Sequence, residues 1–543
     1  MMFADVVFLN GKIVTVDDRG TIAEAVAVKF GKVLAVGSNV EIEKLIGVDT
    51  HVVGLGGRTV IPGLIDSHCH MVGTGISAMA GVLDLSEEAG VRSIADIKAK
   101  IAEKAAATPR SEWIVGDKED DSKLAEKRHP NRWELDEAAP DHPVIISTVG
   151  GHFSMANSRA FERAGVTRET PNPTGGVFDR DAATGELTGG LHEKARDIIL
   201  PEEEYLRNQS REAAAEGAKR ILTANAAAGL TCVYDMVEAP EIRAVLDLKN
   251  RDELPIRIRM DVSIDLFPHL NKLGICQGLG DDWVKICGLK MFLDGAISAR
   301  TAAVSEPYLN RPDFYGVMAT TEEIARRTML EAYGEGYRIS THANGDRAIK
   351  MALDIMEEAQ AKYPRADPRN RIIHCTVVNP VLIRRIGDLH LLPTIFGAYP
   401  YYHGDKLLPA FGERRLEFMF AARSFLEKGV KVAAHSDHSA SPFPPLMGIH
   451  SLVNRVTKGG RPIGRNQRVS VMDALRLYTI NAAYHSFDED RLGSIEVGKC
   501  ADMVVLGRDL LTAPPETIID IPIDMTIVEG RIIYSRSGTP PTR

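Results

Sequence analysis

The sequence predicts an α/β fold: a (β/α)8 TIM barrel with a small composite β-sandwich built from both chain termini and an insertion after the first barrel strand. Three observations lead to this prediction. Short apolar runs alternate with helical segments through the middle of the chain, both ends are rich in strand-forming residues, and one connection is too long for a barrel. With 543 residues, 44% of them hydrophobic, the chain is long enough to bury a large core.

The strands expected at the N-terminus come first. Residues 5–9 and 12–16 are apolar runs separated by Asn10-Gly11, a pair that accepts the positive φ of a tight turn and so predicts a β-hairpin. Residues 25–37 repeat this pattern around a second glycine. Both stretches therefore predict antiparallel β structure.

The other end of the chain has the same strand-forming pattern, with apolar runs at residues 501–507 and 525–535. Neither end has enough strands to form a stable sheet alone. Because chain termini often lie close together, we expect residues 1–61 and 486–543 to form one sandwich beside a barrel of residues 62–485.

Between the two ends, apolar runs alternate with helical segments, which is typical of a parallel sheet. There are eight such runs, the number that a (β/α)8 barrel requires. They are residues 60–70, 229–236, 256–264, 284–295, 337–346, 370–378, 391–399 and 430–438.

One connection in this series is anomalous. Roughly 160 residues separate His70 from Gly229, far more than one barrel connection needs. We therefore expect an insertion at about residues 80–200, within the barrel domain. Since it follows the C-terminal end of the first strand, it would lie over the active-site mouth of the barrel.

Composition and charge exclude several classes of function. Sixty-five Lys and Arg against 74 Asp and Glu give a net charge of −9, whereas a nucleic-acid-binding protein needs a basic surface. No apolar stretch of about 18 residues appears, so no membrane span is expected. The six cysteines are scattered singly and no signal-like segment opens the chain, so we expect a reduced, cytoplasmic protein. A homodimer is the expectation from base rates.

His68-Cys69-His70 ends the first predicted barrel strand. Residues two apart on a strand point to the same side, so both imidazoles face the same way. At the C-terminal end of a barrel strand, that side is the mouth of the barrel, where two imidazoles are a ready pair of ligands for a divalent metal. The alternative is a pair of solvent-exposed loop histidines.

Three further residues end later predicted strands. His342 and His374 follow apolar runs in successive strands, and Asp437 ends the last one. A carboxylate beside a metal can bind it and can also take a proton from metal-bound water. A lone histidine at a strand end is usually structural, however, and Asp437 could cap a following helix, a role that could coexist with metal binding.

Lys290 lies inside an apolar run. A buried, unpaired ammonium is costly, so such a lysine is either paired or chemically altered. Among metal-binding histidines, a neutral Lys290 could be carboxylated to a carbamate that bridges two cations. The alternative is a pair with Asp294 or another carboxylate.

Six segments form a recognisable pattern: VIPGLIDSHCH, GLKMFLDGAISART, STHANGDRAI, RIIHC, HSDHS and LGSIEVGKCADMVVL. Together they resemble the amidohydrolase superfamily of metal-dependent hydrolases, and most closely its YtcJ-like branch, which includes N-substituted formamide deformylases. The resemblance runs nearly end to end. The D-G-x-x-x-x-R-T and H-x-x-G-D-x-A segments and the closing G-S-I-E-x-G-K-x-A-D make it highly specific.

The resemblance implies a metal centre of six side chains: His68, His70, Lys290, His342, His374 and Asp437. In the version with two ions, the HxH pair and Asp437 hold one, His342 and His374 hold the other, and a carboxylated Lys290 bridges them. One or two ions are compatible with the sequence. Zinc is the expected metal, although manganese, iron or cobalt would accept the same ligands. No role is assigned to Cys69, His403, His435 and His438.

The activity implied is hydrolysis of an amide-type C–N bond, N-acyl or N-formyl, in a small molecule. Metal-activated hydroxide is the expected nucleophile, with Asp437 as general base and then general acid. His152 resembles a family position near the active site and is expected to hydrogen-bond the tetrahedral oxygen. Arg300 is expected to pair with a substrate carboxylate. The alternatives are a surface loop for His152 and a structural salt bridge for Arg300.

Two other interpretations compete with this activity. The same centre could hydrolyse an ester or a cyclic amide, or decarboxylate its substrate, because the superfamily changes substrate by changing loops. A non-catalytic scaffold that has lost its metals is an alternative of a different class. The presence of all six predicted ligands argues against the scaffold, since a dead homologue would have lost one or more of them.

Overall fold

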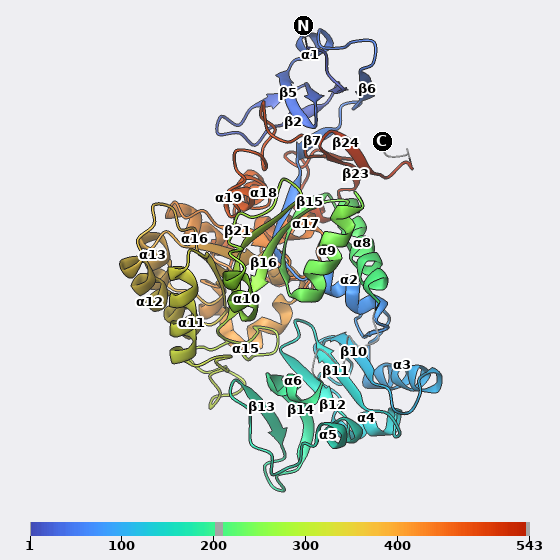
Figure 1. The fold of residues 1–543 in the computed structure, drawn as a ribbon, viewed down its shortest axis with the longest axis vertical. Coiled ribbons are helices and arrows are strands. Elements are labelled where there is room, and N and C mark those ends of the chain that lie inside the picture. The colour runs from blue at the N-terminus through green and yellow to red at the C-terminus, as the bar shows by residue number, and fades with distance from the viewer. Residues whose placement is uncertain (1, 201–209, 539–543) are drawn as a thin grey trace.

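The structure, a computed structural model, describes residues 2–200 and 210–538. A terminal β lobe, a barrel and an inserted sheet follow one another along its long axis (Figure 1). The predicted (β/α)8 architecture is confirmed, with mixed sheets built from the termini and from the insertion. Residues 539–543, the end of the predicted sandwich segment 486–543, lie outside the described residues.

Eight parallel strands form the barrel, and each overlaps one of the predicted apolar runs. In order around the sheet they are β8 (Leu64–Cys69), β15 (Leu230–Val237), β16 (Arg257–Ser263), β17 (Val284–Phe292), β18 (Ile339–Ala343), β19 (Arg371–His374), β20 (Leu392–Phe396) and β21 (Ala433–His435). The ring closes between β21 and β8. There the Asp437 N–H donates to the His68 carbonyl at 3.0 Å, and the His70 N–H donates to the His438 carbonyl at 2.7 Å.

Helices surround the strands and bury their apolar faces against them. In α12, for example, Ile349, Ala352 and Met356 are buried at the three- and four-residue spacing of one helix face. The helices and 3-10 turns of this part are α2 (Met71–Met79), α8 (Arg211–Ala227), α9 (Ala239–Asn250), η1 (Ile264–Leu266), α10 (Phe267–Lys272), α11 (Glu322–Gly334), α12 (Asp346–Lys362), α13 (Pro380–Asp388), α14 (Tyr399–Tyr402), α15 (Gly404–Leu416), α16 (Ala422–Glu427), α17 (Pro445–Asn454), η2 (Arg465–Gln467), α18 (Val471–Leu477) and α19 (Ile480–Tyr484).

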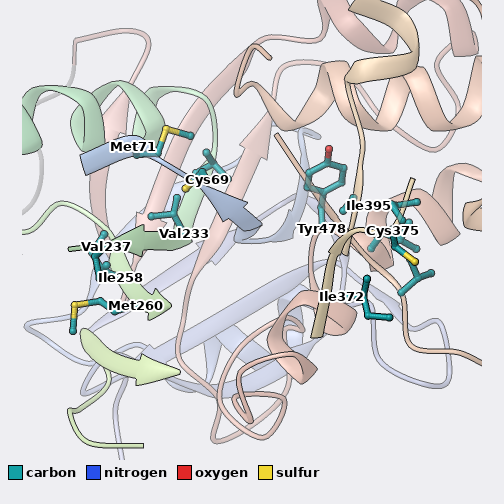
Figure 2. Close-up of a cluster of buried hydrophobic side chains, with 14 of the residues drawn as sticks. Cys69, Met71, Val233, Val237, Ile258, Met260, Ile372, Cys375, Ile395 and Tyr478 are labelled. Carbon is teal, nitrogen blue, oxygen red and sulfur yellow. The ribbon is translucent and has the colours of Figure 1, made fainter. Parts of the chain in front are cut away.

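The largest hydrophobic cluster fills the space between strands and helices (Figure 2). In β15 and β16, Val233, Val237, Ile258 and Met260 belong to it, each no more than 4% exposed. Burial of such a side chain contributes roughly 1.5–3 kcal/mol. Cys69 lies in the same cluster, so the spacer of the HxH motif faces the hydrophobic core.

The terminal lobe consists of two sheets. The first contains β1 (Val6–Leu9), β4 (Ala25–Lys29), β5 (Lys32–Gly37) and β6 (His51–Gly54), and the second contains β2 (Lys12–Val14), β3 (Ile22–Ala23), β7 (Thr59–Pro62), β22 (Met503–Leu506), β23 (Ile523–Val528) and β24 (Arg531–Ser535). Two short elements, α1 (Asn39–Glu43) and η3 (Pro515–Asp520), complete the terminal segments. Because β7 pairs with β22, the two chain ends share one sheet, as the sequence predicted.

The hairpin predicted at Asn10-Gly11 is wrong. Asn10 has the expected positive φ of 60°, but β1 pairs with β4 and β6, whereas β2 pairs with β3 and β7. The chain crosses at this turn from one sheet to the other. The crossing places Phe8 and Ile13 in one buried cluster between the sheets, and this long-range packing outweighs the local turn preference.

The inserted segment forms its own six-stranded sheet, in the order β13-β14-β12-β11-β10-β9. Its strands and helices are β9 (Leu83–Asp84), α3 (Ile94–Ala107), β10 (Ile114–Glu119), α4 (Arg132–Ala138), β11 (Val144–Thr148), β12 (Phe153–Ala156), α5 (Ser158–Ala164), β13 (Gly176–Arg180), β14 (Leu187–Glu193) and α6 (Ala195–Ile199). The sheet has hydrophobic clusters of its own. The insertion is thus a folded unit attached to the barrel.

A buried cluster of charges joins the insertion to the barrel. Asp120 and Asp121 follow β10, and Lys406 of α15 lies between them, with its Nζ 2.9 Å from Asp120 Oδ1 and 2.6 Å from Asp121 Oδ1. The Arg300 guanidinium lies 2.8 Å from the other oxygen of Asp121. The Lys406 side chain is 12% exposed, so these pairs are largely shielded from water.

Two structural findings bear on the predictions made from composition. All six cysteines are free, and only Cys276 is exposed. Within residues 2–200 and 210–538, no helix is both long and apolar enough to cross a membrane. The cellular compartment and the oligomeric state stay predictions.

Replacing Lys406 by Met should destabilise the insertion, because it leaves two buried carboxylates without their shared cation. We expect Lys406→Met to lower the free energy of unfolding by about 3–5 kcal/mol. The measurement is urea denaturation followed by tryptophan fluorescence, to which Trp113 and Trp133 of the insertion contribute. The matched control is Lys458→Met, which breaks a more exposed pair with Glu87 and should cost about 1 kcal/mol or less. Equal losses in the two variants would contradict the role given to the cluster.

Candidate metal centre

Three side chains from opposite ends of the sequence meet at the barrel mouth. His68 lies near the end of β8, His70 directly follows that strand, and Asp437 follows β21, the strand beside it. Asp437 Oδ1 lies 3.4 Å from His68 Nε2 and 3.5 Å from His70 Nε2. One ligand atom from each residue lies within 4.8 Å of the other two, an arrangement that could hold one metal ion. The exposed-loop alternative for the two histidines is wrong, since His68 is fully buried and His70 is half-buried.

Asp66, which the sequence analysis did not single out, links the two strands that carry these residues. Its Oδ1 accepts the backbone N–H groups of His68 at 3.2 Å and Ser436 at 3.1 Å. Burial raises the pKa of Asp66 to about 7. Asp66 sits two residues before His68 in the strand alternation, and that spacing is the signal that could have identified it.

Three more imidazoles line up beside the first group. His374, at the end of β19, has His342 on one side and His435 on the other. Its Nε2 lies 3.1 Å from His342 Nδ1, and its Nδ1 lies 3.3 Å from His435 Nε2. His374, His435 and Asp437 form a second group that could hold a metal ion. His435 was left without a role by the sequence, although its spacing of two from Asp437 repeats the logic of the HxH pair.

A backbone carbonyl orients His342. Its Nε2 lies 3.3 Å from the Gly295 carbonyl oxygen, which can only accept a hydrogen bond. The Asn344 side-chain nitrogen lies 3.2 Å from the same Nε2. When Nε2 carries the proton and donates it to the carbonyl, Nδ1 turns its lone pair toward His374. This is the tautomer that a metal ligand requires.

Burial and mutual repulsion favour uncharged imidazoles in this cluster. Burial is the largest cause that holds the pKa values of His68, His342 and His374 well below the usual range, and it lowers the pKa of His435 to about 3. A neutral imidazole is the form that binds metal ions.

Lys290 lies at the centre of the same cluster. Its Nζ is 2.8 Å from His68 Nε2 and 4.8 Å from the centre of the Phe292 ring, and the residue is 1% exposed. Burial lowers its pKa to about 7. The alternative pairing with Asp294 is wrong, because Asp294 accepts the backbone N–H groups of Ala303, Asn344 and Gly345. In the described part of the chain, no carboxylate forms an ion pair with Lys290 within 4.0 Å.

Asp437 is buried but surrounded by positive or protonatable groups. Burial alone would raise its pKa, but the hydrogen bond to His70 and the charges of His70, His435 and Lys290 outweigh burial, so its pKa lies below the usual value. Asp437 does not cap a helix, since α17 begins eight residues later at Pro445. Its φ of 56° is unusual for a non-glycine residue, as is common where a site constrains the backbone.

His152 faces the site from the insertion. Its ring centre lies 5.1 Å from that of His342, and its Nδ1 lies 2.7 Å from Glu193 Oε2. The side chain is 14% exposed, so it is not a surface histidine. Burial by itself lowers the pKa of His152, but the Glu193 carboxylate outweighs burial and raises it.

The remaining polar residues of interest lie elsewhere. Arg300 pairs with Asp121, the salt-bridge alternative, and lines a different hollow from the one that four of the predicted ligands line, so its role toward a substrate carboxylate stays an untested prediction. His403 Nε2 binds the Ala440 carbonyl at 2.9 Å, and His438 Nδ1 binds the Ser441 carbonyl at 3.2 Å. Both contacts fix loops near the mouth of the barrel.

A cavity of about 490 Å³ opens over these groups. His70, His342, His374 and Asp437 form its floor on the barrel side. The insertion supplies the opposite wall through β10, β11, β14 and the loops that follow them, with His152 among the lining residues. The cavity is large enough for a small molecule and admits it directly to the candidate metal ligands.

Comparisons with known proteins agree with this geometry. A sequence model described as "Amidohydrolase family" matches residues 51–534. The chain is 29% identical to the putative amidohydrolase YtcJ of Bacillus subtilis, over 97% of this chain and 99% of that protein. It is 27% identical to an N-substituted formamide deformylase of Arthrobacter pascens, over 98% and 99%. The crystal structure of an uncharacterized metal-dependent hydrolase from Pyrococcus horikoshii superposes with a TM-score of 0.74 at 25% identity, covering 94% of this chain and 99% of the other.

Replacing Lys290 by Met in metal-free protein tests whether its ammonium supports the fold. Because the ammonium is buried and no carboxylate in residues 2–200 and 210–538 pairs with it, we expect Lys290→Met to change the free energy of unfolding by less than about 1 kcal/mol or to increase it. The measurement is urea denaturation in the presence of a chelator. The control is Arg371→Met, which removes the fully buried partner of Asp261 and should cost about 3–5 kcal/mol. A comparable loss from Lys290→Met would mean that the lysine is paired after all.

Proposed function

The chain belongs to the amidohydrolase family of metal-dependent hydrolases, and we propose that it hydrolyses an amide-type carbon–nitrogen bond of a small molecule, an N-formyl or N-acyl amine. The observation that carries the proposal is the convergence of His68, His70 and Asp437 beside His374 at one cavity. The similarity to a formamide deformylase over nearly the whole chain supports the choice of bond.

The donor set fits a divalent cation. It consists of imidazole nitrogens and one carboxylate, and within the described residues the buried Nδ1 atoms of His68 and His435 have no hydrogen-bond partner. His68, His70 and Asp437 would hold one ion, and His374 with His342 or His435 would hold a second. Zinc is the metal we expect, and manganese, iron and cobalt would suit the same donors. A bound cation of this kind polarises a carbonyl oxygen and lowers the pKa of water towards about 7.

Asp437 is the group that we assign to proton transfer. Its carboxylate lines the cavity, and its lowered pKa keeps it ionised near neutral pH. In this form it can accept the proton of an attacking water and then deliver it to the departing nitrogen, which leaves as an amine. Proton transfer by a positioned carboxylate contributes typically about 10²–10⁴-fold to a rate.

His152 faces the cavity from the insertion, on the side of a substrate opposite the candidate metal ligands. Because its Nδ1 is engaged by Glu193, its Nε2 is the nitrogen that a ligand in the cavity can reach. A hydrogen bond from Nε2 to the substrate carbonyl oxygen would stabilise the charge that develops there during attack. Donation requires the protonated ring, and the Glu193 carboxylate raises the pKa of His152 in that direction.

Lys290 is the candidate for a carbamate. Its pKa of about 7 leaves much of the amine uncharged near neutral pH, and the uncharged amine is the form that adds carbon dioxide and releases one proton. The product would carry a negative charge among the imidazoles, where no carboxylate of the described residues forms an ion pair with the buried amine. Such a group would serve as a bridging oxygen donor for two cations.

Removal of the metal should abolish hydrolysis. We expect purified protein to contain a divalent metal, to hydrolyse at least one member of a panel of N-formyl and N-acyl amines, and to lose that activity after chelation and regain it with zinc. Asp437→Asn should lower kcat by about 10²-fold or more.

Esters, cyclic amides and carboxylated substrates complete the panel, and activity confined to them would favour the alternative reactions of the same centre. Protein without metal and indifferent to the chelator would support the scaffold interpretation.

Carboxylation of Lys290 can be observed directly. We expect metal-loaded protein equilibrated with ¹³C-bicarbonate to give a carbamate carbon signal in its NMR spectrum. Lys290→Met should lack that signal, because it has no amine to react. Lys350→Met, which replaces an exposed lysine, is the control that should retain it. A wild-type spectrum without the signal, at full metal content, would refute the carbamate.

A further inference from the structure

The D-G-x-x-x-x-R-T segment, Asp294 to Thr301, supplies none of the candidate metal ligands. Its first residue fastens two loops together. Asp294 accepts backbone N–H groups of Ala303 at 2.8 Å and of Asn344 at 2.9 Å, so the loop after β17 is tied to the loop after β18. The last residue of the segment, Thr301, is fully buried and points its hydroxyl toward the insertion.

A chain of hydrogen bonds runs from Thr301 to His152. The Ala296 N–H donates to Thr301 Oγ1 at 2.9 Å, so the hydroxyl proton is free to be donated to Glu193 Oε1, also at 2.9 Å. The other oxygen of Glu193 accepts from His152 Nδ1 at 2.7 Å. Each group in this series of hydrogen bonds therefore orients the next, and the series ends at His152 in the cavity.

The backbone reinforces this pairing. Glu193 ends β14 and His152 immediately precedes β12, and these strands are neighbours in the inserted sheet. The Glu193 N–H donates to the His152 carbonyl at 3.1 Å. The two side chains, 14% and 7% exposed, are thus cross-strand neighbours in a largely dry position.

Gly295 provides the space in which Thr301 and Glu193 meet. A Cβ atom at position 295 would lie 2.2 Å from Thr301 Oγ1 and 2.3 Å from Glu193 Oε1. Both distances are far below van der Waals contact, so a larger residue would push the two groups apart. The glycine and the threonine of the segment therefore both serve the placement of Glu193.

We propose that Glu193 is a positioning residue: it holds His152 in one rotamer and in the Nδ1-protonated tautomer, and Thr301 with Gly295 holds Glu193. A carboxylate can only accept at Nδ1, so the opposite tautomer would set a lone pair against the carboxylate. The consequence for catalysis rests on the proposed function of His152 toward the substrate oxygen, in which Nδ1–H stays bound to Glu193 and a second proton, on Nε2, is the one donated. The tautomer itself rests only on the contacts above.

The competing explanation is that Glu193 merely fastens the insertion to the barrel. The two explanations differ at the ring of His152. A fastening role predicts lower stability when Glu193 is lost, with the imidazole unchanged in every variant that folds. A positioning role predicts that the imidazole changes tautomer even where the fold is intact.

The test compares Glu193→Ala, Glu193→Met and Glu193→Gln. The methionine side chain is similar in length to that of glutamate but lacks a carboxylate acceptor. Glu193→Met therefore replaces Glu193→Ala in the comparison if the alanine variant does not fold. Glutamine keeps an oxygen that can accept from Nδ1. The matched control is Asp179→Ala, which removes the carboxylate 2.9 Å from His192 Nε2 in the same sheet, away from the cavity.

The first measurement does not depend on activity. In metal-free protein labelled with ¹⁵N-histidine, at alkaline pH where the ring is neutral, two-bond ¹H–¹⁵N spectra report the tautomer of each ring. The His152 signal is the one missing from His152→Asn. We expect the Nδ1-protonated form in wild type, Glu193→Gln and Asp179→Ala, and a population of the Nε2-protonated form in Glu193→Ala and Glu193→Met. An unchanged tautomer in these last two variants would overturn the proposal.

The second measurement uses an N-formyl amine that the wild type hydrolyses. Glu193→Ala or Glu193→Met should lower kcat by about 10- to 100-fold with little change in KM or metal content, because the misplaced ring fails mainly in the transition state. Glu193→Gln should recover most of the loss, and Asp179→Ala should stay within about twofold of wild type. An increase in KM without a decrease in kcat would contradict the positioning role of Glu193. If no panel substrate is hydrolysed, the proposed function fails, while the tautomer spectra still decide the role of Glu193.

Discussion

The site depends on the closure of the barrel between its last strand and its first. Where β21 meets β8, backbone hydrogen bonds join Asp437 to His68 and His70 to His438, and Asp66 accepts from both strands. This junction brings a carboxylate to two imidazoles from the other end of the chain. The neighbouring strands then add further imidazoles and one lysine to the same buried volume. Burying several nitrogen donors around one carboxylate destabilises a protein core, but the same arrangement suits a bound cation.

The insertion and the barrel complete each other at the mouth. The barrel floor holds the candidate ligands, and the inserted sheet supplies the facing wall with His152. Two sets of contacts fix their relative position: the buried charges around Lys406, and the hydrogen-bond chain through Glu193. The second set reaches the cavity itself. The loop that follows β17, the strand of Lys290, therefore orients this wall. This loop couples the placement of His152 to that of the candidate metal ligands.

Much of the fold and of the site could be predicted from the sequence, because both depend on strand periodicity. The eight apolar runs predicted the barrel strands. The ends of those runs identified the candidate ligands His68, His70, His342, His374 and Asp437. The partners of those strands were harder to predict. β1 and β2 belong to different sheets despite the turn signal at Asn10, and Arg300 pairs with Asp121, which lies 179 residues away in the sequence. His435 was left without a role and Glu193 was not singled out, because neither residue looks unusual until its neighbours are known.

By itself, the sequence determined the order and spacing of the strands, the chemical types of the side chains at their ends, and membership in a family of hydrolases. These properties are local, since each is set by alternation along a few residues or by short motifs. Only the tertiary structure decided which imidazoles meet, that Lys290 lacks a carboxylate partner among the described residues, that Arg300 lies away from the cavity, and that Glu193 contacts His152. Those outcomes depend on contacts between segments far apart in the chain, and such contacts are selected by packing and by the cost of burying unpaired charge.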